Sequence, residues 1–301
     1  MFTQASVLNV TPNVLSTVQS PNPGAGIWMS GAALAADASN NIYAVTGNGT
    51  FDANSPPSID YGDSLLQLND SLGVSQYFTP SNYAVYGTTD QDFGSGGAVV
   101  LADLPATSPV THLIMGGGKN QAVYVLDRDH LGGVGDAFAW QELSLAPSEI
   151  FATGAFWNNT FYIAAVGGKL NAYALDPATA KFGAPTSSNA GYGFPGGTPS
   201  VSAAGTQSGL VWILDTSQYC TPGAPGSACN PAILHAYDAT NMGIELWNSA
   251  MVPADKAGNA VKFTVPTIAN GKVYVGTRGN NLGGNFGSTT TSGELDVYGL
   301  K

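Results

Sequence analysis

The sequence predicts an all-β fold made of repeated antiparallel sheets, and three observations lead to this prediction. Only 10% of the 301 residues are charged, so exposed helix faces would lack the residues that favour helices. The 39 glycines and 18 prolines supply many turns. Short apolar segments alternate with polar residues at period two, as in half-buried strands. These patterns exclude helical bundles, and the 44% of hydrophobic residues excludes intrinsic disorder.

One sequence unit recurs along the chain. A small, Gly-rich strand is followed by an apolar strand near a tyrosine, a turn, and an alternating strand that closes on Asp or Asn. The closing residues are Asn69, Asp127, Asp176 and Asp238, with spacings of 58, 49 and 62 positions. Four-stranded propeller blades of roughly 40–50 residues with inserted loops have such spacings. The sequence therefore predicts a β-propeller.

About five blades of four strands account for most of the chain. We expect one domain over residues 1–301, with blades at approximately 20–85, 90–145, 148–190, 194–250 and 260–301. Residues 1–19 are expected to end a preceding blade, with its last strand at 6–15. That strand either closes a five-bladed ring or belongs to a larger propeller of seven or eight blades. We favour the larger propeller, because an open ring would expose long strand edges.

The two cysteines flank a segment rich in proline and glycine. We expect Cys220 and Cys229 to form a disulfide, which implies an oxidising compartment; two unpaired thiols are the alternative. The N-terminus has neither the basic start nor the apolar core of a signal peptide. The low charge and the polar, uncharged surface composition favour an extracytoplasmic protein, either periplasmic or secreted, whose signal peptide is not in this chain.

Charge and hydropathy also bear on the partners. The formal net charge of −11 would repel phosphate backbones, so nucleic-acid binding is not expected. The longest apolar run, residues 26–36, is shorter than the ~20 residues of a membrane-spanning helix. We therefore expect a small molecule, a carbohydrate or a protein as the ligand of an axial pocket.

Residues 238–247, which read Asp-Ala-Thr-Asn-Met-Gly-Ile-Glu-Leu-Trp, resemble the tryptophan-docking repeat of pyrroloquinoline quinone (PQQ) dehydrogenases. In that family an Asp-containing turn leads to a Trp that packs between adjacent blades. Residues 176–182 are a weaker copy, with Phe182 just before the expected Trp position. The resemblance implies a PQQ-like propeller over residues 26–301.

Three further stretches resemble the quinoprotein alcohol dehydrogenases. Residues 41–48, followed by residues 60–63, are similar to Y-x-x-T-G-N…G-D, whose Asn ligates Ca²⁺ beside the quinone. Residues 89–93 are similar to D-x-x-D-F/Y, whose second Asp is the proposed base, although this segment is one residue shorter. Residues 118–128 are similar to K-N-G-x-x-Y-V-L-D-R, whose Lys contacts the quinone. The resemblance thus implies a metal ligand, a base and a cofactor contact at Asn48, Asp92 and Lys119.

The chain also departs from the pattern of that family. Cys220 and Cys229 are not adjacent, whereas the family stacks its cofactor against a disulfide of adjacent cysteines. Trp28 is a displaced candidate for the opposite stacking face. No Cys-x-x-Cys-His haem motif is present. Each matched residue also has a structural alternative: a tight turn for Asn48, a backbone-amide acceptor for Asp92 and a loop cation for Lys119.

These observations leave three functional hypotheses. The favoured one is an exported, non-catalytic propeller that acts as a binding or scaffold module, because the cofactor constellation is incomplete. The second is a PQQ- and Ca²⁺-dependent alcohol or sugar dehydrogenase, which requires Asn48, Asp92 and Lys119 to converge. A third, polymer or carbohydrate hydrolysis, would need paired carboxylates such as Asp60 and Asp63.

Overall fold

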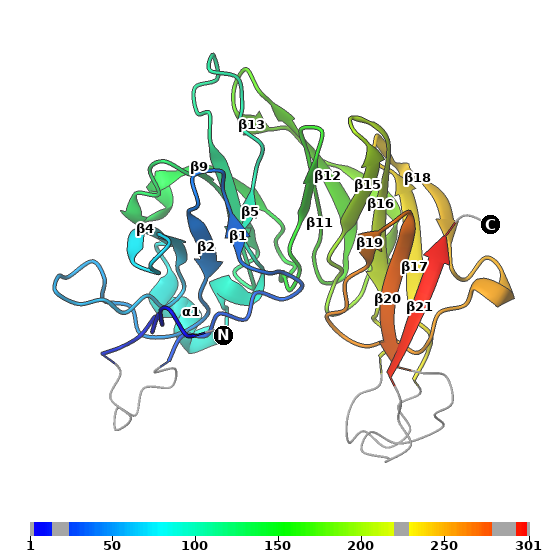
Figure 1. Cartoon of the computed structure of the whole chain (residues 1–301), viewed down its shortest axis with the longest axis horizontal. Helices are drawn as coiled ribbons and strands as arrows, with labels where there is room; N and C mark the ends of the chain where they lie inside the picture. Colours follow the sequence, from blue (N-terminus) through cyan, green and yellow to red (C-terminus); the bar gives the residue numbers. More distant parts are fainter. Residues whose placement is uncertain (1–2, 14–23, 220–228, 279–292, 300–301) are drawn as a thin grey trace. The chain divides into compact units, whose positions relative to one another are not determined.

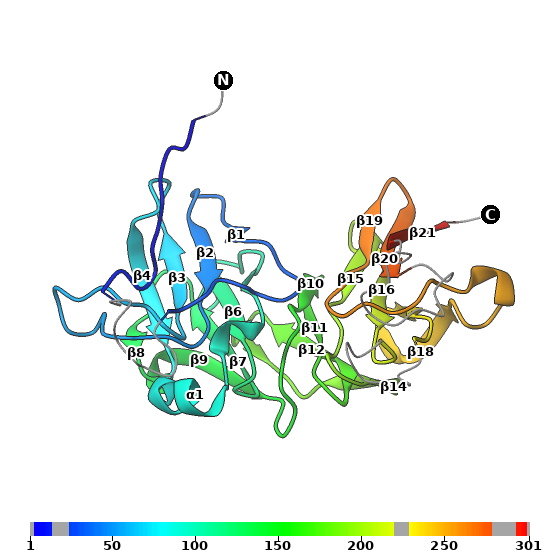
Figure 2. The same cartoon turned by 90° about the horizontal axis from the view of Figure 1, so that it is seen from below.

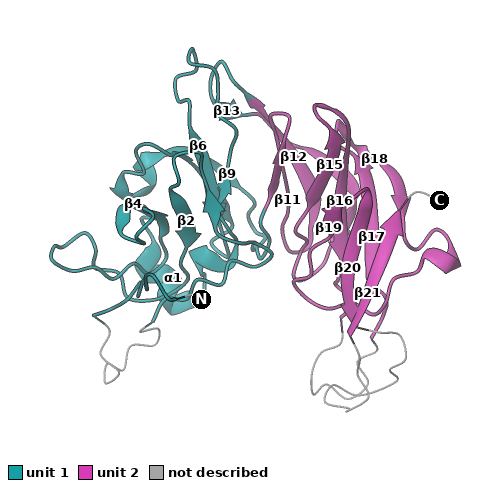
Figure 3. Ribbon diagram, viewed as in Figure 1, with its two compact units in different colours: residues 1–153, 176–182 teal, residues 154–175, 183–301 magenta. Residues whose placement is uncertain are grey.

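The computed structural model describes residues 3–13, 24–219, 229–278 and 293–299 (Figure 1). Contacts between residues divide the chain into two compact units, where the sequence led us to expect one domain (Figure 3). Unit 1 consists of Met1–Thr153 and Asp176–Phe182, and unit 2 consists of Gly154–Leu175 and Gly183–Lys301.

Unit 1 contains two sheets of mostly sequential antiparallel strands, one of which has an added parallel edge strand. The first sheet has the order β1 (Ala35–Ala36), β2 (Ile42–Val45), β3 (Leu65–Leu68), β4 (Val74–Thr79) and β8 (Gly133–Val134). The second has the order β5 (Val99–Val100), β6 (Leu113–Gly117), β7 (Ala122–Asp127) and β9 (Ala139–Ser144). β8 pairs in parallel with β4 and so covers the outer edge of the first sheet.

Unit 2 contains three more sheets of the same kind. Its first sheet is formed by β10 (Ala155–Trp157), β11 (Thr160–Ala164), β12 (Gly168–Asp176) and β14 (Thr186–Tyr192). The next has the order β15 (Ser200–Ala204), β16 (Gln207–Asp215), β17 (Ile233–Asp238) and β18 (Asn241–Asn248). The last has the order β19 (Thr267–Ala269), β20 (Lys272–Arg278) and β21 (Gly293–Gly299). These sheets confirm the prediction of an all-β propeller fold with about five blades.

The remaining elements are short. Unit 1 holds α1 (Tyr83–Thr89), η1 (Phe93–Ser95), η2 (Asp136–Phe138) and β13 (Lys181–Phe182), and unit 2 holds η3 (Pro253–Asp255). Helix α1 was not predicted from the sequence, and it buries a single side chain, that of Tyr86. No helix in the described part of the chain is long and apolar enough to cross a membrane.

A recurring turn explains the Asp or Asn that closes each unit of sequence. The Oδ1 atom of each of these residues accepts a hydrogen bond, 2.8 to 3.0 Å long, from the backbone N–H two positions later. The four residues are Asn69, Asp127, Asp176 and Asp238. This Asx turn reverses the chain after the third strand in four of the five sheets. The Asp or Asn that recurs in the sequence therefore marks the same type of turn each time.

The N-terminal segment differs from the prediction. Residues 3–13 form no strand, so the strand expected at 6–15 is wrong over its described part. Pro12 has no backbone N–H to donate to a sheet, which disfavours a paired strand here. The segment instead packs on the first sheet: the Tyr61 N–H donates to the Val10 carbonyl at 2.7 Å, and Val10 lies in one cluster with Leu66 and Leu68.

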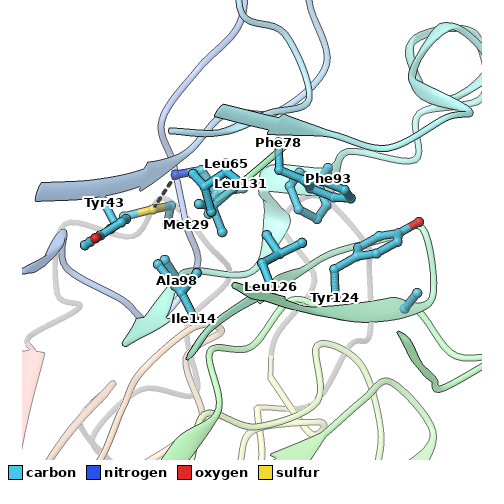
Figure 4. Close-up of a cluster of buried hydrophobic side chains, with 12 residues drawn as sticks. Met29, Tyr43, Leu65, Phe78, Phe93, Ala98, Ile114, Tyr124, Leu126 and Leu131 are labelled. Atoms are coloured by element: carbon cyan, nitrogen blue, oxygen red, sulfur yellow. Dashed lines mark hydrogen bonds between the residues drawn. The ribbon is translucent and has the colours of Figure 1, made fainter. Parts of the chain in front are cut away.

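The core of unit 1 lies between its two sheets. Phe78, Phe93 and Tyr124 pack ring against ring with centroid distances of 5.0 to 6.2 Å (Figure 4). Leu65 and Ile114 bring fully buried side chains from the two sheets to the same cluster. Apolar burial between successive sheets stabilises neighbouring blades against each other.

In unit 2, Trp247 occupies the position that the docking resemblance implies. Its ring lies 5.5 Å from that of Tyr298 on β21 and 6.5 Å from that of Trp212 on β16. Trp247 therefore packs between two adjacent sheets, which lie side by side in both views (Figure 2). The weaker copy in unit 1 docks differently: Gln141 on β9 bonds both the N–H and the carbonyl of Phe182.

The predicted disulfide is only partly within the described residues. Cys229 is disulfide-bonded. Its expected partner, Cys220, lies outside the described residues.

Candidate functional site

The three residues matched to quinoprotein motifs converge at one end of the sheets of unit 1. Asn48 lies in the β2–β3 connection, Asp92 in the β4–β5 connection and Lys119 in the β6–β7 connection. In a sheet of sequential antiparallel strands, the connection after the second strand and the one after the fourth leave from the same end. The topology therefore brings these side chains together although they are far apart in sequence.

Lys119 forms a buried ion pair with Asp92. Its Nζ lies 2.5 Å from Asp92 Oδ2, and the two side chains are only 10% and 12% exposed. Asp90 Oδ1 lies 3.0 Å from the same nitrogen, but its side chain is 84% exposed. Burial by itself would lower the pKa of Lys119, and the two carboxylates outweigh it and raise that pKa above its ordinary value. The ammonium therefore stays charged.

Asn48 contacts the other oxygen of the same carboxylate. Its backbone N–H donates to Asp92 Oδ1 at 2.9 Å, so both oxygens of Asp92 have partners. The side-chain Oδ1 of Asn48 is buried and has no hydrogen-bond partner among the described residues. Because buried polar atoms without partners are rare and destabilising, this oxygen is a candidate ligand atom.

Close backbone approach holds the three connections together. The Lys119 N–H donates to the Asp92 carbonyl at 2.9 Å and to Ser95 Oγ at 2.8 Å. A Cβ at Gly47 would lie 2.7 Å from Asp92 Oδ1, and one at Gly118 would overlap the Asp92 carbonyl oxygen. Only glycine leaves room for these contacts.

Asp63 is a third acidic group of this cluster, beside Asp92 and Asp90. It is 1% exposed, and its Oδ1 accepts the Phe93 N–H at 2.9 Å. Burial, and then the charge of Asp92, raise the pKa of Asp63 to about 7, although the Phe93 N–H and Lys119 oppose the rise. The sequence suggested Asp63 as part of the dehydrogenase resemblance and as one of a conceivable hydrolytic pair with Asp60. Asp60 instead accepts the Asn13 N–H at 2.9 Å, so each carboxyl group holds a different loop.

Two aromatic rings border the ammonium. Lys119 Nζ lies 5.8 Å from the Trp28 ring centroid and 5.7 Å from that of Phe151. The two rings are in direct contact, with centroids 6.3 Å apart and a 55° tilt, so a planar group does not fit between them. Trp28 is 43% exposed. Phe151 was not predicted, because it lies outside every repeat motif and nothing in the sequence marks it.

The cluster does not complete the metal and cofactor site that the resemblance implies. Ca²⁺ takes about six to eight oxygen ligands. Among the described residues, the cluster offers one buried side-chain oxygen without a partner, Asn48 Oδ1, and no group of three or more His, Cys, Asp or Glu could hold a metal. Trp28 and Phe151 form no slot for a quinone. The described residues therefore do not fit PQQ with Ca²⁺.

Comparison with family models and with curated proteins finds no match for this chain. Among solved structures, quinohemoprotein alcohol dehydrogenase from Comamonas testosteroni is similar with a TM-score of 0.43 and 14% identity, over 82% of this chain and 44% of that protein. BamB from Moraxella catarrhalis is similar with a TM-score of 0.34 and 12% identity, over 78% of this chain and 63% of that protein. The chain thus spans less than two thirds of each neighbour. The fold assignment rests on the sheets described above.

Proposed function

We propose that this chain is an extracytoplasmic, PQQ-like propeller that binds a small molecule, a carbohydrate or a protein and does not itself oxidise alcohols. The Lys119–Asp92 ion pair carries this proposal. A general base needs an oxygen that is free to take the substrate proton. Both oxygens of Asp92 are already engaged, since Lys119 Nζ lies at Oδ2 and the Asn48 N–H donates to Oδ1, and the side chain is only 12% exposed. Lys119 is in turn neutralised by Asp92 and Asp90 instead of facing a quinone oxygen.

The same cluster supports a role in recognition. Trp28 exposes 43% of its surface beside loops that are fixed by an ion pair and by backbone hydrogen bonds. A rigid, partly exposed indole offers contact area with little loss of conformational entropy on binding. The low charge of the chain and the disulfide at Cys229 support a place outside the cytoplasm.

The alternative is a PQQ- and Ca²⁺-dependent alcohol or sugar dehydrogenase. It is favoured by the convergence of Asn48, Asp92 and Lys119 and by the unpartnered oxygen of Asn48. It requires further oxygen ligands and a stacking slot that the described residues do not supply.

A dye-reduction assay separates the two functions. The full chain is incubated with PQQ and Ca²⁺ and tested with a panel of alcohols and sugars, alongside Asp92→Asn and the matched control Asp90→Asn. We expect no substrate-dependent reduction in any of the three proteins. Reduction by the wild type that is lost in Asp92→Asn and kept in Asp90→Asn would contradict the proposal and establish the dehydrogenase.

A binding assay tests recognition directly. The labelled chain is applied to a glycan array, with Trp28→Ala as the test variant and Phe138→Ala as the control, because Phe138, on η2, is also half exposed but makes none of the contacts of the cluster described above. We expect glycan binding that Trp28→Ala removes and Phe138→Ala preserves. Equal binding by both variants would exclude this surface as the glycan site.

A further inference from the structure

A second lysine is held by aromatic rings, and it lies in unit 2. Lys262 Nζ is 5.0 Å from the ring centroid of Tyr219, 5.5 Å from that of Phe194 and 5.6 Å from that of Phe263. All three distances are within the range of cation–π attraction, in which the negative face of the ring stabilises a positive charge.

The three rings come from three different connections. Phe194 lies between β14 and β15, Tyr219 between β16 and β17, and Phe263 between β18 and β19. These connections leave the sheets of unit 2 from the same end, for the topological reason given for unit 1. The rings also touch one another: the Phe194 centroid is 6.1 Å from that of Tyr219 and 6.4 Å from that of Phe263. Three sequence-distant rings therefore surround one point, and an ammonium occupies it.

The backbone of Phe263, which contributes one of the three rings, has an unfavourable conformation. Phe263 has φ +66°, a left-handed conformation that is unfavourable for a bulky residue. Its side chain is nevertheless 40% exposed, so burial of the ring does not explain the strain. Such outliers persist where the surrounding structure enforces them, and they concentrate at binding sites.

The charge of Lys262 is balanced differently from that of Lys119. Among the described residues, no Asp or Glu forms an ion pair with Lys262, so the rings are its charge-stabilising partners there. Aromatic faces favour positive charge of any source, and a methylated ammonium is less strongly hydrated than the NH₃⁺ of lysine. The net charge of −11 raises the local concentration of cations around the protein.

We propose that Phe194, Tyr219 and Phe263 form an aromatic cage for ammonium groups, which Lys262 fills in the free chain and which a quaternary ammonium ligand enters by displacing it. The four-carbon stem of lysine allows this exchange without movement of the sheets. The cage is in the other unit from the Lys119 cluster, so this inference does not depend on the function proposed above.

Choline titration tests the cage. Removal of the resident ammonium by Lys262→Ala should lower the apparent Kd for choline by about tenfold or more, measured by calorimetry or by NMR shifts of the aromatic rings. Neohexanol, the uncharged isostere of choline, should not bind to this variant. Lys272→Ala is the control, because Lys272 is an exposed lysine at the start of β20, and its choline affinity should equal that of the wild type.

A second variant keeps the proposal testable if Lys262→Ala does not fold. Lys262→Gln keeps a polar side chain, shorter than that of lysine, and removes the charge, and it should bind choline more tightly than the wild type does. Adding Phe263→Ala to either variant should abolish choline binding. Equal affinity for choline and neohexanol, or no saturable choline binding in variants that melt like the wild type, would overturn the proposal and leave Lys262 as a cation that only joins three loops.

Discussion

Lys119 in unit 1 and Lys262 in unit 2 show two ways in which this chain holds an ammonium against aromatic rings. Lys119 is 10% exposed and has two carboxylates within 3.0 Å. Lys262 has three aromatic rings within 5.6 Å and no carboxylate partner among the described residues. A charge that is taken out of water needs an opposite charge, whereas a partly solvated one is adequately held by aromatic faces. The carboxylates around Lys119 leave no place for another cation. The rings around Lys262, by contrast, can be occupied by a competing cation.

The largest expected effect comes from breaking the buried pair. Lys119→Met leaves the Asp92 carboxylate buried without its counter-charge, so we expect a loss of about 3 kcal/mol in the free energy of unfolding at neutral pH. Chemical denaturation measures this loss. The double variant Lys119→Met/Asp92→Asn should regain a large part of it, since no charge is then left unpaired. If the loss in the double variant equalled the sum of the losses in Lys119→Met and Asp92→Asn, the two side chains would not be energetically coupled as an ion pair.

The second effect is a pH dependence that arises from Asp63. Its pKa is raised from 3.8 to about 7 in the folded chain, so the folded state binds a proton that the unfolded state releases. The resulting stabilisation is full below about pH 4 and is lost as the pH rises through about 7. Asp63→Asn keeps an oxygen for the Phe93 N–H and cannot ionise. We expect it to match the wild type near pH 3 and to be more stable by about 3 kcal/mol near pH 8.

Denaturation curves at both pH values test this prediction. Asp60→Asn is the matched control, because Asp60 is equally buried but its Oδ1 accepts the N–H of Asn13, in another loop. A stability difference between wild type and Asp63→Asn that is the same at both pH values would show that Asp63 does not carry the raised pKa.

The third prediction concerns how much the contacts between Lys262 and the aromatic rings contribute to the free energy of unfolding. Lys262→Ala should lower the free energy of unfolding by about 1 kcal/mol, with little dependence on salt, because a cation–π contact has no long-range counter-charge to screen. Urea denaturation at low and high salt checks both parts. A loss as large as that of Lys119→Met would mean that Lys262 has a carboxylate partner after all, and the contrast between the two lysines would fail.

The smallest effect separates the two carboxylates of Lys119. Asp90→Asn removes a partner that is 84% exposed, so we expect a change within about 0.5 kcal/mol that disappears at high salt. Asp90→Asn and Asp92→Asn are compared in the same denaturation experiments, at low and at high salt. An equal loss for both variants would show that burial does not distinguish the two pairs.

The sequence predicted the propeller because its signals are local. The closing residue Asp127 of the sequence unit is the last residue of β7, and the Asx turn at Asp127 involves only residues near in sequence. Such features form wherever their residues occur. The expected strand at 6–15 failed over its described part because Pro12 lies within it, and Pro cannot donate to a ladder.

For the site, the sequence alone determined which residue types stand in which connection, and the resemblance made the convergence of Asn48, Asp92 and Lys119 a requirement of the dehydrogenase hypothesis. Only the tertiary structure decided what they do there. Whether Lys119 faces a ligand or binds Asp92 depends on loop separations of a few ångströms, and the raised pKa of Asp63 depends on burial by other segments. The rings around Lys262 come from three connections far apart in sequence, and no local pattern encodes that distance.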